Sequence, residues 1–347
     1  MTINDIINAF YLLGNDIREG LFAEPYRTMM NRAEAENPWF LQFMQRTALN
    51  NLCHLLNDKN LVANELIAHG FQLNTTIEQN KNILIVCAGN IPAVAFHDIM
   101  CVLLSGCNAV IKLSSNDKTI IPFLLERLTL ILPEIKSKIR YIAPDTLNNK
   151  DNIHGVIATG SDSSSLVFEQ YFSNTKHIIR KSRHSVAIIT ENDDISGLED
   201  DICLYFSQGC RSVSHLFVPQ NYDFTFLSKN LLRYSDIINH NKYRNNYDYQ
   251  KAIMIMNNIA FVEAIPILLR ENEELYSPVA VVNYSYYNTV EDLATIIEQQ
   301  KDTLQCVAMN GELNVDGVSF VGFGSCQKPI FTDYADGVNT MDWLKGI

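Results

Sequence analysis

The amino-acid sequence predicts an α/β protein with two domains, each built around a parallel sheet. Its 347 residues are enough for two ordinary domains with separate hydrophobic cores. Hydrophobic residues make up 47% of the chain and charged residues 19%, a balance typical of globular proteins. From about residue 80 onward, short apolar runs alternate with helical segments, which is typical of parallel βαβ units with both sheet faces covered.

The first part of the chain, from about residue 3 to residue 70, is predicted to be helical. Ile3, Ile6, Phe10 and Leu13 recur at the spacing of one helix face. The chain contains no internal repeat and no low-complexity linker. We assign residues 1–75 to an N-terminal helical segment.

A doubly wound domain is predicted over residues 76–205. Its first strand is the apolar run 82–87, which is bounded by Gly89 and Pro92. Further strands are predicted at 109–113, 139–142, 155–158 and 186–190. Helices are predicted at 92–104, 118–132 and 164–172.

A second set of strands and helices predicts another domain over residues 206–325. The strands are expected at 214–218, 279–283, 305–308 and 319–321. The helices are expected near 224–238, 247–257 and 289–301. The boundary then falls near 200–212, which places Cys210 at the start of the second domain and leaves residues 326–347 as a C-terminal segment.

Composition excludes several classes of function. The net charge of −12 would repel a phosphate backbone, so we expect no nucleic-acid partner. The first residues lack the pattern of a signal peptide, and no apolar run approaches the ~20 residues of a membrane span. The eight cysteines show no CxxC pair and no zinc spacing, so we expect no metal site and a reduced, cytoplasmic protein.

Four segments carry the chemistry of the chain, and the first is centred on Cys210. Cys210 follows Gln-Gly in a turn before an apolar strand, a position suited to a nucleophile, although an isolated cysteine is more often part of a core. The other segments are Ala88-Gly89-Asn90-Ile91-Pro92, Val110-Ile111-Lys112-Leu113-Ser114-Ser115 and Glu274-Leu275-Tyr276-Ser277-Pro278-Val279. In this order they resemble the signature segments of the aldehyde dehydrogenase superfamily, most closely its acyl-CoA reductase branch, which includes the fatty-acid reductase component of bacterial bioluminescence.

The resemblance covers about residues 80–330 and implies a nicotinamide-binding domain followed by a cysteine-bearing catalytic domain. Cys210 falls where the superfamily keeps its nucleophile. Asn90 falls where a side-chain amide donates to the oxyanion, together with the backbone N–H of Cys210. Taken alone, Gly-Asn-Ile-Pro is a turn sequence.

The resemblance also implies a set of cofactor-binding residues. Lys112 matches the lysine of a Lys-Pro-Ser-Glu segment, which holds the adenosine ribose, and Glu274 and Tyr276 match residues that hold the nicotinamide ribose and line its pocket. Gly160 and Ser161 follow a predicted strand and precede a helix, where backbone amides can hold a pyrophosphate. Ser115 replaces the acidic residue of the family, which removes a repulsion toward a 2′-phosphate, so the expected cofactor is NADPH, with NADH as the alternative.

One absence separates this chain from hydrolytic aldehyde dehydrogenases. Their water-activating glutamate lies in a Glu-Leu-Gly-Gly-Lys segment, and the matching residues 180–185 contain no carboxylate. An enzyme that exchanges its thioester with CoA needs no activated water. His184 and His215 are candidates for assisting proton transfer, with a purely structural role as the alternative.

The sequence thus predicts NADPH-dependent reduction of a fatty acyl-CoA to the aldehyde through a Cys210 acyl-enzyme. One alternative is a reductase of the same fold acting on an acyl phosphate or an acyl-protein thioester. The other is a catalytically silent, nucleotide-binding scaffold. An acyl thioester is therefore the expected partner molecule, and a homo-oligomer or an acyl-donor protein stays open.

Overall fold

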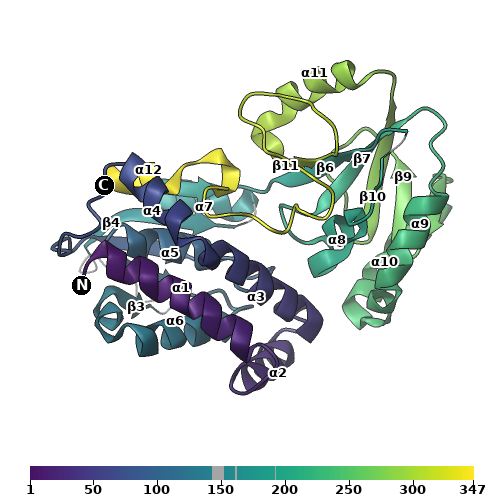
Figure 1. Ribbon diagram of the computed structural model, residues 1–347. Coiled ribbons are helices and arrows are strands. Elements are labelled where there is room, and N and C mark those ends of the chain that lie inside the picture. Colours follow the sequence, from purple (N-terminus) through teal and green to yellow (C-terminus); the bar gives the residue numbers. More distant parts are fainter. Residues whose placement is uncertain (143–151, 161, 192) are drawn as a thin grey trace. The chain divides into compact units, whose positions relative to one another are not determined.

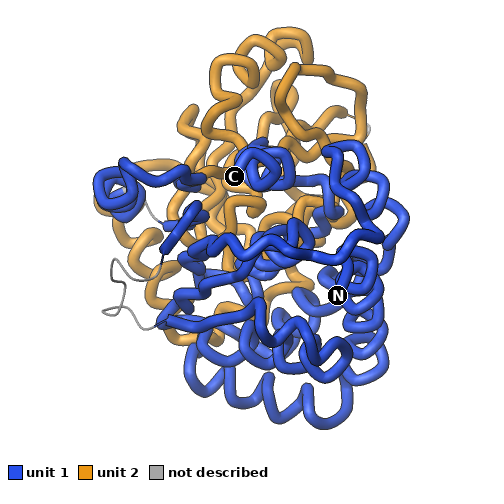
Figure 2. Tube along the Cα trace, turned by 90° about the vertical axis from the view of Figure 1, so that its left-hand side faces the viewer, with its two compact units in different colours: residues 1–182, 328–347 blue, residues 183–327 orange. Residues whose placement is uncertain are grey.

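The computed structural model describes residues 1–142, 152–160, 162–191 and 193–347. The chain divides into two compact units, which are coloured separately in Figure 2. Unit 1 comprises residues 1–182 and 328–347, and unit 2 comprises residues 183–327.

Unit 1 is built on a five-stranded parallel sheet with the strand order β3-β2-β1-β4-β5. This order places β1 and β4 side by side where the winding reverses, as in doubly wound nucleotide-binding folds. The strands are β1 (Asn82–Val86), β2 (Asn108–Lys112), β3 (Ile139–Tyr141), β4 (Ile153–Thr159) and β5 (Lys176–Arg180).

Helices cover both faces of this sheet (Figure 1). Ile83 and Ile85 of β1 belong to the same core as the N-terminal helices, whereas Leu84 and Val86 pack with Phe172 on the opposite face. The N-terminal helices therefore form one layer of unit 1. The helices are α1 (Ile3–Gly20), α2 (Tyr26–Glu36), α3 (Gln42–Asn57), α4 (Lys59–Ala68), α5 (Phe96–Leu104), α6 (Ile120–Ile131), α7 (Asp162–Tyr171) and α12 (Thr340–Lys345).

Unit 2 contains a seven-stranded sheet with the order β12-β11-β6-β7-β10-β9-β8. All neighbouring strands are parallel except the pair β8 and β9 at one edge. The strands are β6 (His184–Ile188), β7 (Val213–Pro219), β8 (Phe261–Ala264), β9 (Ile267–Glu271), β10 (Val281–Tyr287), β11 (Leu304–Ala308) and β12 (Phe320–Val321). The helices are α8 (Leu198–Cys203), α9 (Thr225–Leu231), α10 (Asn241–Met256) and α11 (Val290–Gln300).

The boundary between the two units lies between residues 182 and 183, whereas the predicted boundary lies between residues 205 and 206. The reason is β6, which the sequence analysis assigned to the first domain. β6 pairs with β7 and β11, so its hydrogen bonds place it in the sheet of unit 2. The chain therefore enters unit 2 at Arg183 and leaves it after Gln327.

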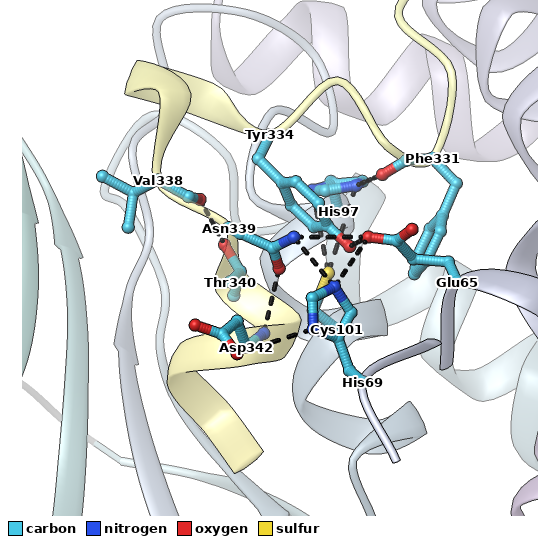
Figure 3. A network of polar contacts seen from close by, with 10 residues as sticks. All are labelled: Glu65, His69, His97, Cys101, Phe331, Tyr334, Val338, Asn339, Thr340 and Asp342. Carbon is cyan, nitrogen blue, oxygen red and sulfur yellow. Dashed lines mark hydrogen bonds and ion pairs between the residues drawn. The ribbon is translucent and has the colours of Figure 1, made fainter. Parts of the chain in front are cut away.

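The C-terminal segment belongs to unit 1, where it is held by a partly buried network of polar contacts (Figure 3). Glu65 Oε1 accepts hydrogen bonds from the Tyr334 hydroxyl (2.9 Å) and the Asn339 side-chain amide (3.3 Å). Asn339 also lies 3.0 Å from the His69 ring, and Phe331 offers its carbonyl to His97 at 2.8 Å. Contacts of this kind fix residues 328–347 to α4 and α5.

Candidate active site

The segment of the predicted catalytic residue Asn90 and two predicted cofactor segments lie at one edge of the sheet in unit 1. The strands β1, β2 and β4 are parallel neighbours, and Val86 is the register partner of both Lys112 and Ala158. Their carboxyl ends therefore coincide. Ligands of open α/β sheets bind outside this edge, next to the point where the strand order reverses.

The loops after β1 and β2 approach each other closely at Gly89. A Cβ atom at Gly89 would lie 2.4 Å from the Ser114 hydroxyl oxygen, so only glycine fits here. The buried Asp117 carboxylate accepts the backbone N–H of Ala93 and of Ile120, both at 3.1 Å. Asp117, which the sequence analysis did not single out, therefore joins the loop of Asn90 to the segment after β2.

The predicted polar residues of this edge differ in exposure. Asn90 and Ser115 are exposed, and Lys112 is half-buried at the end of β2. Gly160 follows β4, and a Cβ atom there would lie 2.9 Å from Cβ of Ser164 in α7. Ser161 lies outside the residues that the structure describes.

In unit 2 the predicted catalytic residue Cys210 and the predicted cofactor residues Glu274 and Tyr276 lie near the amino edge of the sheet. Cys210 is half-buried in the loop that precedes β7, and Glu274 and Tyr276 precede β10. Because β7 and β10 are parallel neighbours, their amino ends coincide. The structure thus brings the Cys210 loop and the Glu274 segment to the same edge of the same sheet.

The turn before Cys210 has an unusual backbone. Tyr205, Phe206 and Ser207 have φ values of 57°, 58° and 58°, the left-handed region that costs a residue with a side chain roughly 1–2 kcal/mol. Phe206 is fully buried against the rings of His240 and Tyr243, which holds the turn. Strain of this kind gathers at functional sites. None of these residue types favours a positive φ, so the sequence gives no signal for it.

Hydrogen bonds from neighbouring strands and loops fix the Cys210 loop. The Ser185 hydroxyl of β6 donates to the Cys210 carbonyl at 2.9 Å and lies 3.1 Å from the Cys306 sulfur. The Ser212 N–H donates to the Gly209 carbonyl at 3.0 Å, which closes the turn around Cys210. The loop is thereby tied to β6 and indirectly to β11.

Another thiol, that of Cys306, lies near this loop, and its acidity is altered. A hydrogen bond from Cys326 lowers the pKa of Cys306 to about 7, and the nearby Arg211 charge contributes in the same direction. Cys306 is fully buried, whereas Cys210 is half-buried. A substrate of ordinary size therefore reaches Cys210 more readily than Cys306.

Glu274 and Tyr276 present their side chains to solvent. Tyr276 is 66% exposed, and the Glu274 carboxylate makes no hydrogen bond or ion pair with any described residue. The backbone between them is fixed, because the Ser214 hydroxyl of β7 donates to the Leu275 carbonyl at 2.6 Å. This arrangement leaves a carboxylate and an aromatic ring available to a ligand.

The two candidate histidines have different surroundings. His215 is fully buried, both of its ring nitrogens have partners, and burial lowers its pKa to about 4. His184 is half-buried, its Nε2 atom has no hydrogen-bond partner within the described part of the chain, and burial lowers its pKa. Both rings are therefore neutral at pH 7, and the unpaired Nε2 atom of His184 is buried.

Residues 180–185 match the water-activating segment of hydrolytic enzymes, and their basic side chains bind neighbouring segments of the chain. Arg180 is buried and donates to Asp98 at 2.6 Å and to the Ala335 carbonyl at 2.5 Å. Arg183 donates to the Leu304 carbonyl at 2.8 Å. These basic residues thus fasten neighbouring segments, and no carboxylate occurs between residues 180 and 185.

The described residues contain neither a metal-binding cluster nor a helix able to span a membrane. No cluster of three or more His, Cys, Asp or Glu side chains is arranged to bind a metal ion. Among these residues, too, no helix combines the length and apolarity needed to cross a bilayer.

Solved structures with a similar fold are aldehyde dehydrogenases. Betaine aldehyde dehydrogenase from Staphylococcus aureus, solved in complex with NAD⁺, shares 12% identity with a TM-score of 0.67, and the match covers 97% of this chain and 79% of that one. Aldehyde dehydrogenase 21 from Physcomitrella patens, solved with the reaction product succinate, shares 11% identity with a TM-score of 0.64, covering 94% and 79% of the two chains. The chain therefore has the aldehyde dehydrogenase fold, as the sequence analysis predicted.

Comparison at the level of sequence identifies the family within this fold. No curated protein matches the chain. The acyl-CoA reductase (LuxC) family matches residues 2–316, which is most of the 347 residues and includes the Cys210 loop and the Glu274 segment. The chain is therefore a member of the acyl-CoA reductase (LuxC) family, an aldehyde-related oxidoreductase.

Proposed function

We propose that the enzyme reduces a fatty acyl-CoA to the aldehyde with NADPH, through an acyl-enzyme on Cys210. The observation that carries this proposal is the Cys210 loop itself. Its half-buried thiol follows three left-handed residues and lies at the same sheet edge as the exposed Glu274 carboxylate. A strained, tightly hydrogen-bonded loop that presents one thiol is suited to a nucleophile.

The proposed nicotinamide cofactor fits the residues present. At the carboxyl edge of the sheet, Lys112 is half-buried and Ser115 is exposed, and Gly160 lies two residues before α7, where backbone amides can bind a phosphate. Lys112, Ser115 and Ser161 are the proposed contacts to the adenosine and phosphate part. Glu274 and Tyr276 are the proposed contacts to the nicotinamide ribose and its ring.

The proposed reaction begins at the thioester. The Cys210 thiolate attacks the carbonyl carbon, a carbon–sulfur bond forms, and the bond to the CoA sulfur breaks, so that CoA leaves as a thiolate and takes up a proton. The Asn90 amide and the Cys210 N–H are the proposed donors to the oxyanion, each worth about a hundred- to a thousandfold in rate. A bound reduced nicotinamide supplies the hydride that converts the acyl-enzyme to aldehyde and frees the thiolate.

Intact-protein mass spectrometry tests the thioester step. The protein is mixed with acyl-CoAs of several chain lengths in the absence of nicotinamide. We expect a mass gain of one acyl group, which NADPH then discharges. The gain should disappear in Cys210→Ala.

A matched control is available in Cys306→Ala. Cys306 is the thiol whose pKa is lowered to about 7, but it is fully buried. The adduct should therefore persist in this variant. Loss of the adduct in Cys306→Ala and its persistence in Cys210→Ala would move the nucleophile to Cys306. If no acyl-CoA forms an adduct but an acyl phosphate does, the substrate is an acyl phosphate and not an acyl-CoA.

Cofactor selectivity is tested at Ser115. The exposed Ser115 stands where the superfamily carries an acidic residue, and a carboxylate there would repel a 2′-phosphate. We expect NADPH to give a higher kcat/KM than NADH in the wild type. Ser115→Glu should shift the ratio toward NADH by about tenfold, which corresponds to ~1.4 kcal/mol. Faster wild-type turnover with NADH would contradict the proposed selectivity, and Ser115→Ala serves as the uncharged control.

A further inference from the structure

Side chains of two neighbouring strands bind every carbonyl of the segment 274–276. The Glu274 carbonyl accepts hydrogen bonds from two side chains, with His215 Nδ1 at 3.1 Å and Asn283 Nδ2 at 2.8 Å. The Leu275 carbonyl accepts from the Ser214 hydroxyl at 2.6 Å. The Tyr276 carbonyl accepts from Asn283 Nδ2 at 2.8 Å. These hydrogen bonds fix the backbone of the segment to β7 and β10, while the side chains of Glu274 and Tyr276 are exposed to solvent.

The partners of His215 fix its tautomer. A carbonyl only accepts, so Nδ1 must carry the proton that it donates to Glu274. Nε2 then accepts from the Ser285 hydroxyl at 2.9 Å. Because His215 is fully buried, this neutral form persists at pH 7. The ring is therefore already engaged at both nitrogens and has no free site for proton transfer.

Asn283 makes hydrogen bonds with both of its amide hydrogens and with its side-chain oxygen. It is fully buried, and its two amide hydrogens go to Glu274 and Tyr276, while its Oδ1 accepts from Arg270 Nε at 3.0 Å. His215, Asn283 and Arg270 are register partners on β7, β10 and β9. A row of polar side chains on neighbouring strands thus ends at the Glu274 segment. Burial of polar groups is costly unless they are hydrogen-bonded, and both fully buried side chains of this row, His215 and Asn283, have partners.

We propose that Asn283 and His215 are positioning residues for cofactor binding. They hold the Glu274 and Tyr276 carbonyls so that the carboxylate and the ring meet the nicotinamide ribose in a fixed geometry. His215 belongs to β7, the strand that follows the Cys210 loop, so the same strand fixes the nucleophile and the cofactor segment. This inference rests on the proposed function, because it assumes that Glu274 binds the nicotinamide ribose.

The experiment measures NADPH affinity by nicotinamide fluorescence in the wild type and in Asn283→Ala. Losing two buried hydrogen bonds should weaken NADPH binding roughly tenfold. Acylation of Cys210 by acyl-CoA without nicotinamide should keep its full stoichiometry, which shows that unit 2 is folded. Asn283→Asp, which keeps the shape and the acceptor for Arg270 but loses both donors when ionised, should weaken NADPH binding in the same way.

A double-mutant cycle with Glu274→Ala separates positioning from a general loss of stability. If Asn283 acts through Glu274, its substitution should have little further effect on NADPH affinity once the carboxylate is gone. Tyr287→Phe is the matched control, since it removes a hydrogen bond to the Ile189 carbonyl from the same strand without touching the segment. NADPH affinity should stay at the wild-type level in this variant.

The NADPH affinities of the Glu274 and Asn283 variants distinguish failure of the positioning role from failure of the proposed role of Glu274. If Glu274→Ala weakens NADPH binding and Asn283→Ala does not, only the positioning role is wrong. If the two effects simply add, Asn283 acts on stability rather than through Glu274, and the inference also fails. If Glu274→Ala leaves NADPH affinity unchanged, the proposed role of Glu274 fails and the positioning role fails with it.

Discussion

At the scale of single residues, Gly89 lies where the Ser114 side chain leaves no room for a Cβ atom. A Cβ atom there would lie 2.4 Å from Oγ and 2.7 Å from Cβ of Ser114. Gly89→Ala should therefore push the segment after β2 away from the sheet edge. We expect kcat/KM for NADPH to fall by up to about a hundredfold, the cost of a displacement of about 1 Å in a positioned site.

The cause of that loss can be checked by a second substitution. Ser114→Gly removes both crowded atoms and should restore much of the activity of Gly89→Ala, while Ser114→Gly alone should behave almost as the wild type. Steady-state kinetics of the four proteins is the measurement. A double variant as slow as Gly89→Ala would show that crowding against Ser114 is not the reason.

His215 gives a residue-scale prediction about pH. Burial lowers its pKa from 6.5 to about 4 in the folded protein, so the unfolded chain takes up the proton first as the pH falls. The stability that the neutral ring contributes is complete above pH 6.5 and is lost as the pH falls toward 4. The loss should be on the order of 3 kcal/mol, since each pKa unit corresponds to 1.36 kcal/mol.

Urea denaturation of the wild type and His215→Gln at several pH values measures this contribution. Other groups titrate in the same range, and burial raises the pKa of Asp201 to about 6, which acts in the opposite direction. The difference between the two proteins isolates His215. If both proteins lose the same free energy of unfolding between pH 7 and pH 4, His215 does not contribute to the pH dependence of stability.

At the scale of elements, Arg180 connects β5 to α5 and to the C-terminal segment. Its guanidinium binds Asp98, the Ala335 carbonyl and the Thr340 hydroxyl, and the side chain is buried. Removing one partner of a buried ion pair typically costs ~3–5 kcal/mol, because the other charge remains buried. Arg180→Met should therefore destabilise unit 1 by about this amount and loosen residues 328–347.

Hydrogen exchange locates that effect. We expect faster exchange in residues 328–347 of Arg180→Met, with little change in β7 and β10 of unit 2. Lys181→Met is the control, because Lys181 is an exposed residue in a surface ion pair with Glu169. Equal exchange in the two variants would mean that the network around Glu65 and Tyr334 suffices to hold the segment (Figure 3).

The elements themselves show which signals the sequence contains. Buried strands such as β1 and β11 are predicted within a residue or two, because their apolar runs are bounded by turn residues. β5 was missed, since Lys176, His177 and Arg180 interrupt its apolar character. β8 and β9 were missed as well, because they are short and lie at the sheet edge on either side of Pro266.

The candidate site was predictable only where a motif marks it. Cys210 and Glu274 are predicted from the segments that contain them. Asn283 has no motif of its own, and its part depends on the register that places it beside His215. The left-handed turn before Cys210 depends on the packing of Phe206, which is likewise a property of the folded chain.

At the scale of the whole molecule, each unit has a hydrophobic core of its own. The core of unit 1 joins the N-terminal helices to one face of its sheet, whereas a separate cluster around Val186, Leu293 and Val307 fills unit 2. Two cores joined by two chain crossings are unlike a small two-state domain. We therefore expect calorimetric unfolding in two transitions rather than one.

The two tryptophans assign these transitions. Trp39 and Trp343 both belong to unit 1, so their fluorescence reports on unit 1, whereas circular dichroism reports on both units. NADPH at a hundred times its Kd should stabilise the unit that binds it by ~2.7 kcal/mol. Because Lys112 and Gly160 belong to unit 1, the fluorescence-detected midpoint should rise with NADPH.

Lys112→Ala provides the control for this shift. Without the ammonium group that is proposed to hold the adenosine ribose, the same NADPH concentration should raise the midpoint less, whereas the midpoint without cofactor should hardly move because Lys112 is only half-buried. A cofactor-induced rise seen by circular dichroism but absent from tryptophan fluorescence would assign the main binding energy to unit 2. The Glu274 segment, rather than the carboxyl edge of β1 and β2, would then dominate nicotinamide recognition.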